Sequence, residues 1–144
     1  MKIALEEAKK ALEKDEVPIG AVLVYQNQII SRSHNQVEFL QDATAHAELL
    51  CLREAAAKLH NWRLNGATVY CTLQPCLMCA GALILSRVDR MVYAAPDFRH
   101  GADLTLFSNH PIHKIEISQG GFSETSSLLL KNFFKRCRHD KTLR

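Results

Sequence analysis

The chain has 144 residues, a length typical of one domain, and 47% of them are apolar, enough to build one hydrophobic core. Charged residues make up 23%, and this balance excludes a disordered chain, a collagen-like fibre and a long coiled coil. The longest apolar run, residues 77–85, is shorter than the about 20 residues that a membrane-spanning helix needs. Glu6 and Glu7 stand where a signal peptide has its apolar region, so we expect a soluble, cytoplasmic protein without a membrane partner.

The net charge of +3 is unevenly distributed, because the end of the chain is strongly basic. The basic residues of this tail, opposed only by Asp140, are Lys131, Lys135, Arg136, Arg138, Lys141 and Arg144. A basic terminal helix fits contact with a polyanion such as nucleic acid. It also fits a solvated helix end, where the helix dipole favours cations, and charge alone favours this second interpretation.

Hydrophobic periodicity and turn residues predict nine helices and strands. In chain order these are a helix at 2–14, strands at 19–25 and 29–33, a helix at 45–60, a strand at 67–73, a helix at 75–86, strands at 90–95 and 114–118, and a helix at 123–138. Thr44 is the expected N-cap of the second helix, and Pro75 is expected in the first turn of the third. Segments 35–44 and 96–111 are expected to be irregular. Strands alternating with helices predict a three-layer α/β fold, in a single domain over residues 1–144.

Five cysteines, an odd number, in a protein that is not exported argue against a disulfide framework. Cys51 and Cys71 stand in apolar periodic segments and are expected in the core, whereas Cys137 is expected to be a surface thiol in the basic tail. Cys76 and Cys79 remain, with C-x-x-C spacing at the expected start of a helix, where the dipole lowers thiol pKa values. Such a pair fits two zinc ligands, a redox pair or two buried cysteines.

His46 and Glu48 form an H-x-E motif at the start of another helix. Residues two apart lie about 200° apart around a helix, so both side chains reach one site only if it lies over the helix N-terminus. His46, Cys76 and Cys79 supply three ligands, the number typical of a catalytic zinc that also binds water. Glu48 alone fits an acid favoured by the dipole, but beside His46 it is favoured as the general base. The remaining histidines are expected at the surface: His34, His60, His100, His110, His113 and His139.

H-x-E followed by P-C-x-x-C is the signature of zinc nucleobase deaminases. Longer stretches resemble one family more specifically, the bacterial tRNA-specific adenosine deaminases. These stretches are 16–24, 44–48, 72–82, 86–87 and 133–134, and basic residues follow the last of them. Cytosine, guanine and riboflavin-pathway deaminases share only the two short motifs.

The resemblance implies a cytidine deaminase-like fold, a three-layer α/β/α sandwich around a mixed five-stranded sheet. It implies zinc-dependent hydrolytic deamination of adenosine to inosine at the wobble position of an arginine tRNA. One Zn²⁺ per subunit is implied, held by His46, Cys76 and Cys79, with Glu48 as the catalytic residue and no organic cofactor. The family also implies a homodimer whose two subunits both contact tRNA.

Two further residues match substrate-binding positions of the family. Asn35 matches the asparagine of the pocket, and Asp97 matches an acidic loop position near the nucleotide beside the target. Without the resemblance, each residue fits an ordinary turn. The family commonly has Glu where Gln74 stands, and residues 98–101 depart from its pattern.

A macromolecular substrate gives the basic residues a further interpretation, since phosphate contacts position an RNA. The expected phosphate contacts are Arg99, which keeps a positive charge in the divergent loop, and Lys135, Arg136 and Arg138 in the tail.

Two alternatives use the same residues. A deaminase of free bases or nucleosides shares the zinc chemistry but has no use for a basic terminal helix. A zinc-stabilised RNA-binding module without enzymatic activity needs a fourth protein ligand, which the sequence does not offer. The tRNA adenosine deaminase is therefore the favoured hypothesis.

Overall fold

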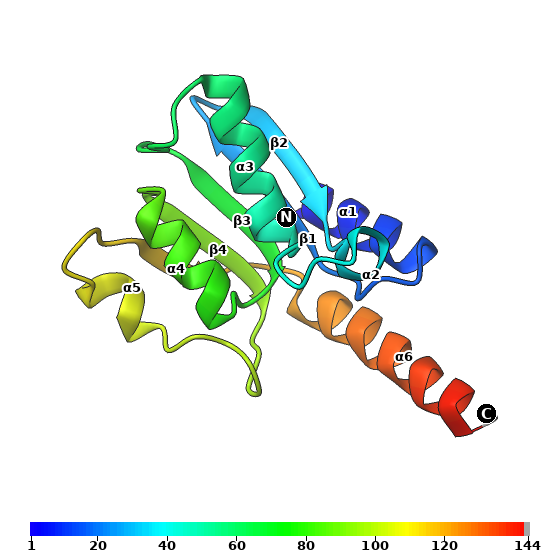
Figure 1. The fold of residues 1–144 in the computed structure, drawn as a ribbon. Helices are drawn as coiled ribbons and strands as arrows, with labels where there is room; N and C mark the ends of the chain where they lie inside the picture. The colour runs from blue at the N-terminus through cyan, green and yellow to red at the C-terminus, as the bar shows by residue number, and fades with distance from the viewer. Residues whose placement is uncertain (143–144) are drawn as a thin grey trace.

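A computed structural model describes residues 1–142, with side chains up to Asp140, so the side chains of Lys141 and Arg144 lie outside the described residues. The elements are α1 (Lys2–Glu13), β1 (Gly20–Tyr25), β2 (Gln28–His34), α2 (Val37–Leu40), α3 (Ala47–Leu59), β3 (Thr68–Leu73), α4 (Leu77–Leu85), β4 (Arg90–Ala95), α5 (Thr105–Asn109), β5 (Glu116–Gln119) and α6 (Ser123–Thr142). Figure 1 shows α6 running outward from the rest of the described fold.

The five strands form one mixed sheet in the order β2-β1-β3-β4-β5. β1 is antiparallel to both neighbours, whereas β3, β4 and β5 run parallel. The β1–β2 turn has positive φ at Gln26 (50°) and Asn27 (60°), which matches the right-handed twist of a two-residue hairpin. Parallel neighbours need crossover connections, and α4 and α5 lie on them.

Alternating side chains divide the sheet into two buried faces. Ala21 and Leu23 on β1 share the main core with Val69 and Cys71 on β3, and α3, α4 and α5 cover this face. Helices α1 and α6 contact the sheet from its other side (Figure 1). The three layers and the mixed sheet confirm the predicted fold class.

Close approach of α1 to β1 explains one glycine. A Cβ at Gly20 would overlap the carbonyl oxygen of Ala4 and lie 2.6 Å from the backbone nitrogen of Ala8. Gly20 therefore lets the helix lie directly on the start of β1.

Several local predictions were wrong. Thr44 is not the N-cap of α3, because its hydroxyl donates to Asp42 (2.7 Å), and His46 caps the helix instead. Pro75 lies before the N-cap of α4 rather than in its first turn. Segments 35–44 and 96–111 contain the short helices α2 and α5, which are too brief to show a period.

The predicted cysteine environments are partly confirmed. Cys51 and Cys71 are buried in the core, but Cys137 is half-buried rather than a surface thiol. No helix within the described residues combines the length and apolarity that crossing a membrane requires.

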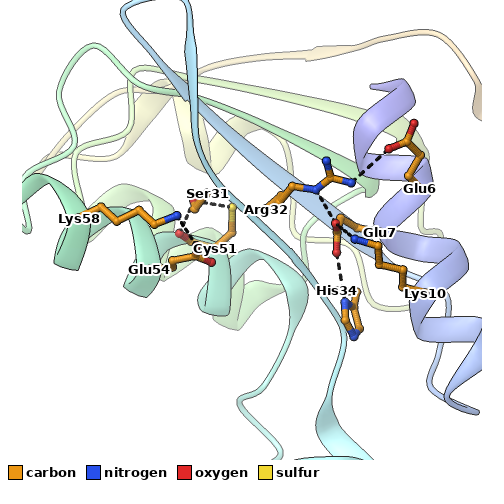
Figure 2. A network of polar contacts seen from close by, with 9 residues as sticks. All are labelled: Glu6, Glu7, Lys10, Ser31, Arg32, His34, Cys51, Glu54 and Lys58. Carbon is orange, nitrogen blue, oxygen red and sulfur yellow. Dashed lines mark hydrogen bonds and ion pairs between the residues drawn. The ribbon is translucent and has the colours of Figure 1, made fainter.

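A network of charged side chains around the buried Glu7 joins α1 to β2 (Figure 2). Glu7 accepts hydrogen bonds from Lys10 (2.8 Å) and from the guanidinium of Arg32, and His34 Nδ1 lies 3.2 Å from its other oxygen. His34, expected at the surface, is therefore buried, and its Nε2 lies 3.3 Å from Nζ of Lys14. The wrong prediction arises because this partner on α1 is distant in sequence.

Candidate active site

Two helix starts converge at one end of the sheet. His46 occupies the N-cap position of α3, and Cys76 occupies that of α4. Both residues have extended backbone geometry (φ −71°, ψ 151° and φ −72°, ψ 173°). Neither side chain caps its own helix with a hydrogen bond. The imidazole and the thiol face each other instead, so the partial positive charges of two helix N-termini surround the same point.

His46, Cys76 and Cys79 form a cluster with the spacing of metal ligands. His46 Nδ1 lies 3.6 Å from the Sγ atom of each cysteine, and all three ligand atoms lie within 4.8 Å of one another. Zinc bonds of about 2.3 Å to sulfur and about 2.0–2.1 Å to nitrogen in a tetrahedron separate nitrogen from sulfur by about 3.5–3.6 Å. The two nitrogen–sulfur distances therefore fit the binding of Zn²⁺ by these side chains.

Contacts within this cluster shift the pKa values of its two thiols. A hydrogen bond from Cys79, aided by His46, lowers the pKa of Cys76 to about 4, so Cys76 is a thiolate at neutral pH. The same contact to Cys76, together with burial, raises the pKa of Cys79. The Cys76 thiolate in turn raises the pKa of His46.

Glu48 lies in the first turn of α3, next to the cluster but outside its ligand set. Its side chain is buried, and burial raises the pKa of the carboxyl group. Glu48, His46 and Cys76 all line a cavity of about 730 Å³. A carboxyl group with a raised pKa at such a cavity has the properties of a general acid and base.

Asn35 also lies on the wall of this cavity, where a carboxylate fixes its orientation. The Asn35 amide donates to Glu16 (3.1 Å), which also accepts the backbone N–H groups of Phe39 (2.7 Å) and Glu38 (3.3 Å). Because a carboxylate only accepts, this contact determines which end of the amide is the nitrogen. Sequence reasoning missed Glu16, although it begins a stretch that matches the family.

The loop after β4 also lines the cavity, through residues that include Asp97 and Arg99. One Asp97 oxygen accepts the backbone N–H groups of Arg99 (3.0 Å) and His100 (3.1 Å), so this residue does form a turn. Gln74 accepts the N–H of Asp97 (3.1 Å) and donates to the carbonyl of Ala102 (2.9 Å). A glutamate at position 74 has no N–H to donate, so the amide gives the loop a second anchor.

Helix α6 contributes a third wall through Ser127, Leu130, Lys131 and Phe134. The three basic residues predicted there are placed differently. Arg138 lines an adjoining cavity of about 280 Å³, Lys135 is exposed, and Arg136 forms an ion pair with Asp15 (2.8 Å).

Comparisons with known proteins agree with this geometry. A family model of MafB19-like deaminases matches residues 1–138. A tRNA-specific adenosine deaminase of Bacillus subtilis is 48% identical over 145 residues, covering 98% of this chain and 90% of the relative. One from Aquifex aeolicus is 43% identical over 144 residues, covering 97% and 95%.

A solved structure from a study of A-to-I editing by tRNA:A34 deaminases at the wobble position of transfer RNA is also similar. It has a TM-score of 0.85 and 42% sequence identity, and the match covers 90% of this chain and 97% of that one. The fold and the cluster at its two helix starts thus define a deaminase of the MafB19-like family. Within that class, the chain belongs to the tRNA-specific adenosine deaminases.

Proposed function

We propose that this protein is a zinc-dependent enzyme that deaminates adenosine to inosine at the wobble position of an arginine tRNA. The observation that carries the proposal is the arrangement of the cavity: three metal-ligand side chains lie beside a buried carboxyl group that is not a ligand. The family relationship supports tRNA as the substrate. The choice of arginine tRNA extends the resemblance seen in the sequence.

His46, Cys76 and Cys79 would hold one Zn²⁺ per subunit. When bound, zinc lowers the pKa of a water to about 7 and so supplies a nucleophile at neutral pH. Three protein ligands would leave the metal able to bind a water molecule as well. No organic cofactor enters the reaction.

Glu48 moves the protons of the reaction. Water adds to C6 of the adenine ring, and the Glu48 carboxylate takes the proton that the water loses. The protonated carboxyl group donates that proton to the ring nitrogen. Glu48 then takes the proton of the hydroxyl group now attached to C6 and passes it to the departing amino group, so adenosine and water yield inosine and ammonia. Burial of Glu48 favours this cycle, because it raises the pKa of the carboxyl group and so makes the protonated form less costly to reach.

Asn35 and Asp97, which both line the cavity, would bind the substrate. With its amide nitrogen directed to Glu16, Asn35 offers its oxygen to a hydroxyl or amino donor of the nucleoside. Asp97 holds the loop that also carries Arg99, so a phosphate contact of Arg99 depends on the turn that Asp97 forms.

An anticodon loop suits this cavity because its bases are already unpaired, so extruding the target costs little. Lys135, Arg136 and Arg138 on α6 would meet the phosphates of the RNA. Arg136 is engaged by Asp15, so we expect its contribution to be the smallest of the three.

We also propose a homodimer formed through the outer face of α4. This helix, LMCAGALIL, carries no charged residue, and such a helix normally lies buried on all sides. Leu77 and Leu85 are nevertheless 71% and 57% exposed in the single chain. Trp62 and Leu85 help to line a groove of about 450 Å³ on the same face. A second copy of the chain would cover these side chains.

The direct test is inosine formation by the purified, zinc-loaded protein. An anticodon stem-loop of arginine tRNA with adenosine at the wobble position is incubated with enzyme, digested and analysed by nucleoside mass spectrometry. We expect inosine from this stem-loop, and no uridine from a matched stem-loop with cytidine at that position. Absence of inosine from folded, zinc-loaded protein, with activity on free guanine or cytosine, would contradict the proposal.

A further inference from the structure

Phe98 stands at the tip of the loop between β4 and α5, on the rim of the cavity. Its side chain is 95% exposed, the largest exposed fraction among the large apolar residues of the described chain. A single exposed apolar residue is ordinary, but this one lines the cavity beside Arg99 and His100. The proposed deamination of the target base assigns it no part.

The loop that carries Phe98 is anchored at several points. Beyond the turn of Asp97 and the two hydrogen bonds of Gln74, the N–H of Gly101 donates to the carbonyl of Asp97 (3.1 Å). The N–H of Ala102 donates to the carbonyl of Pro75 (2.9 Å), next to the metal ligand Cys76. A Cβ at Gly101 would overlap the Asp97 carbonyl, so the tight turn needs glycine there. The Phe98 ring therefore projects from a backbone fixed relative to the site.

The surface next to Phe98 has the composition of a nucleotide-binding groove. The active-site cavity continues into the cavity of about 280 Å³ between this loop and α6, because Arg99, Lys131 and Phe134 line both. Among the described residues that line the smaller cavity there are three cations and no acid: Arg99, Leu130, Lys131, Phe134 and Arg138. Cations together with aromatic faces are what an unpaired nucleotide requires, since its phosphate is anionic and its base stacks.

We propose that Phe98 is a specificity-determining residue that stacks on an unpaired nucleotide adjacent to the target adenosine. Arg99 and Lys131 neutralise the phosphate of that nucleotide. The inference deepens the proposed function and rests on it. Because the backbone that carries the ring is anchored, little backbone freedom is lost when the ring stacks. The ring does not touch the reacting atoms, so its contact strengthens substrate binding rather than the chemical step.

This position predicts how Phe98 affects kinetics. Stacking on an aromatic face tolerates every base, so Phe98 favours RNA with an unpaired neighbour without selecting one sequence. A group that binds substrate and transition state equally changes KM and leaves kcat unchanged. Free adenosine, which has no neighbouring nucleotide, gains nothing from Phe98.

The test compares Phe98→Ala, Phe98→Trp and the control Phe122→Ala, which removes another exposed ring outside the cavity lining. Steady-state inosine formation is measured on the anticodon stem-loop. We expect Phe98→Ala to raise KM about tenfold at unchanged kcat, and Phe98→Trp to restore KM. Phe122→Ala should keep the wild-type values.

A second readout reports stacking itself. 2-Aminopurine is placed on the 5′ or the 3′ side of the target adenosine, and its fluorescence is recorded as zinc-loaded enzyme binds. We expect quenching at one of these positions with wild type and Phe98→Trp, and loss of that quenching with Phe98→Ala. Unchanged KM and unchanged quenching in Phe98→Ala, with active wild-type enzyme, would overturn the role of Phe98 alone. Wild-type enzyme that forms no inosine would instead overturn the proposed function.

Discussion

Glu7 and Glu48 are almost equally buried, with 3% and 4% of their surface exposed, yet their surroundings drive them in opposite directions. Burial alone would raise the pKa of Glu7, but hydrogen bonds from Lys10, Arg32 and His34 outweigh it and lower the pKa to about 2. Glu48 faces the cavity and the metal-ligand cluster, and burial raises its pKa. A small exposed surface therefore does not by itself decide the direction in which a carboxyl pKa shifts; for Glu7 the hydrogen-bond donors around it decide the direction.

The two environments correspond to two roles. Donors from two elements surround Glu7 in the network of Figure 2, so its charge joins α1 to β2. Glu48 lines the cavity, where the proposed mechanism requires it to exchange protons with the substrate. Glu16 lies between these cases, since it is buried at the cavity but holds Asn35 and the start of α2 in place.

We expect the largest effect from a substitution that removes the metal site and does not change Glu7. Cys76→Ala deprives zinc of one of three protein ligands, so we expect loss of bound zinc and of inosine formation together. Zinc content is measured by elemental mass spectrometry beside the stem-loop assay. Cys137→Ala, on α6 away from the cluster, should retain both. A zinc-free Cys76→Ala protein with full activity would refute the assigned ligand set.

The next largest effect concerns the contribution of Glu7 to the free energy of unfolding. Glu7→Gln leaves Arg32 and His34 without their anionic partner, and we expect the free energy of unfolding to fall by roughly 3 kcal/mol. The matched control is Glu6→Gln, because Glu6 pairs with the same Arg32 (3.1 Å) from an exposed position. That variant should cost less than about 1 kcal/mol. Urea unfolding of both variants decides whether burial makes the difference.

Acid should remove the contribution of Glu7 gradually. The pKa of its carboxyl group falls from the ordinary value of 4.5 to about 2 on folding, so the ionised form stabilises the protein fully above pH 4.5. This stability, roughly 3 kcal/mol, is lost as the pH decreases from about 4.5 to about 2. Unfolding of wild type and Glu7→Gln is compared across this range. The difference between the two proteins should shrink towards low pH, and a constant difference would show that Glu7 is not ionised through this network.

The smallest effects concern exposed charges, where solvent weakens every pair. Lys135→Ala and Arg138→Ala should each weaken binding of the stem-loop a few-fold and lower the slope of log K against log salt by about 0.7. Arg136→Ala should change the slope less, since Asp15 already neutralises Arg136. Titrations at several salt concentrations measure these slopes, with Lys9→Ala, an exposed position on α1, as the control. Equal slopes in all four variants would contradict the proposed contact of α6 with RNA.

Much of the fold was predictable because periodicity reports which face of an element is buried. The strands and long helices follow from that pattern, and the H-x-E and C-x-x-C motifs mark the helix starts that meet in space. Contacts between segments that are distant in the sequence produce no such pattern. The burial of His34 depends on Glu7 of α1, and Glu16 becomes a support for Asn35 only once β2 and α2 are folded.

The loop after β4 shows the same limit. The resemblance to the family identifies Asp97 as a matching position and Phe98 as a departure from the pattern. It does not indicate that Gln74 anchors both ends of the turn or that the Phe98 ring faces solvent at the cavity rim. Those facts depend on how β3 and β4 bring two loops together.

The most direct test measures Glu48→Gln and Glu7→Gln side by side, each for inosine formation under single-turnover conditions and for urea unfolding. Glu48→Gln should form inosine about 10²–10⁴ times more slowly than wild type, with a free energy of unfolding that is equal or higher. Glu7→Gln should keep the wild-type rate on the folded protein and lose stability. Glu48→Gln with wild-type activity, or Glu7→Gln that is inactive although folded, would contradict the assignment of proton transfer to Glu48 and of structure to Glu7.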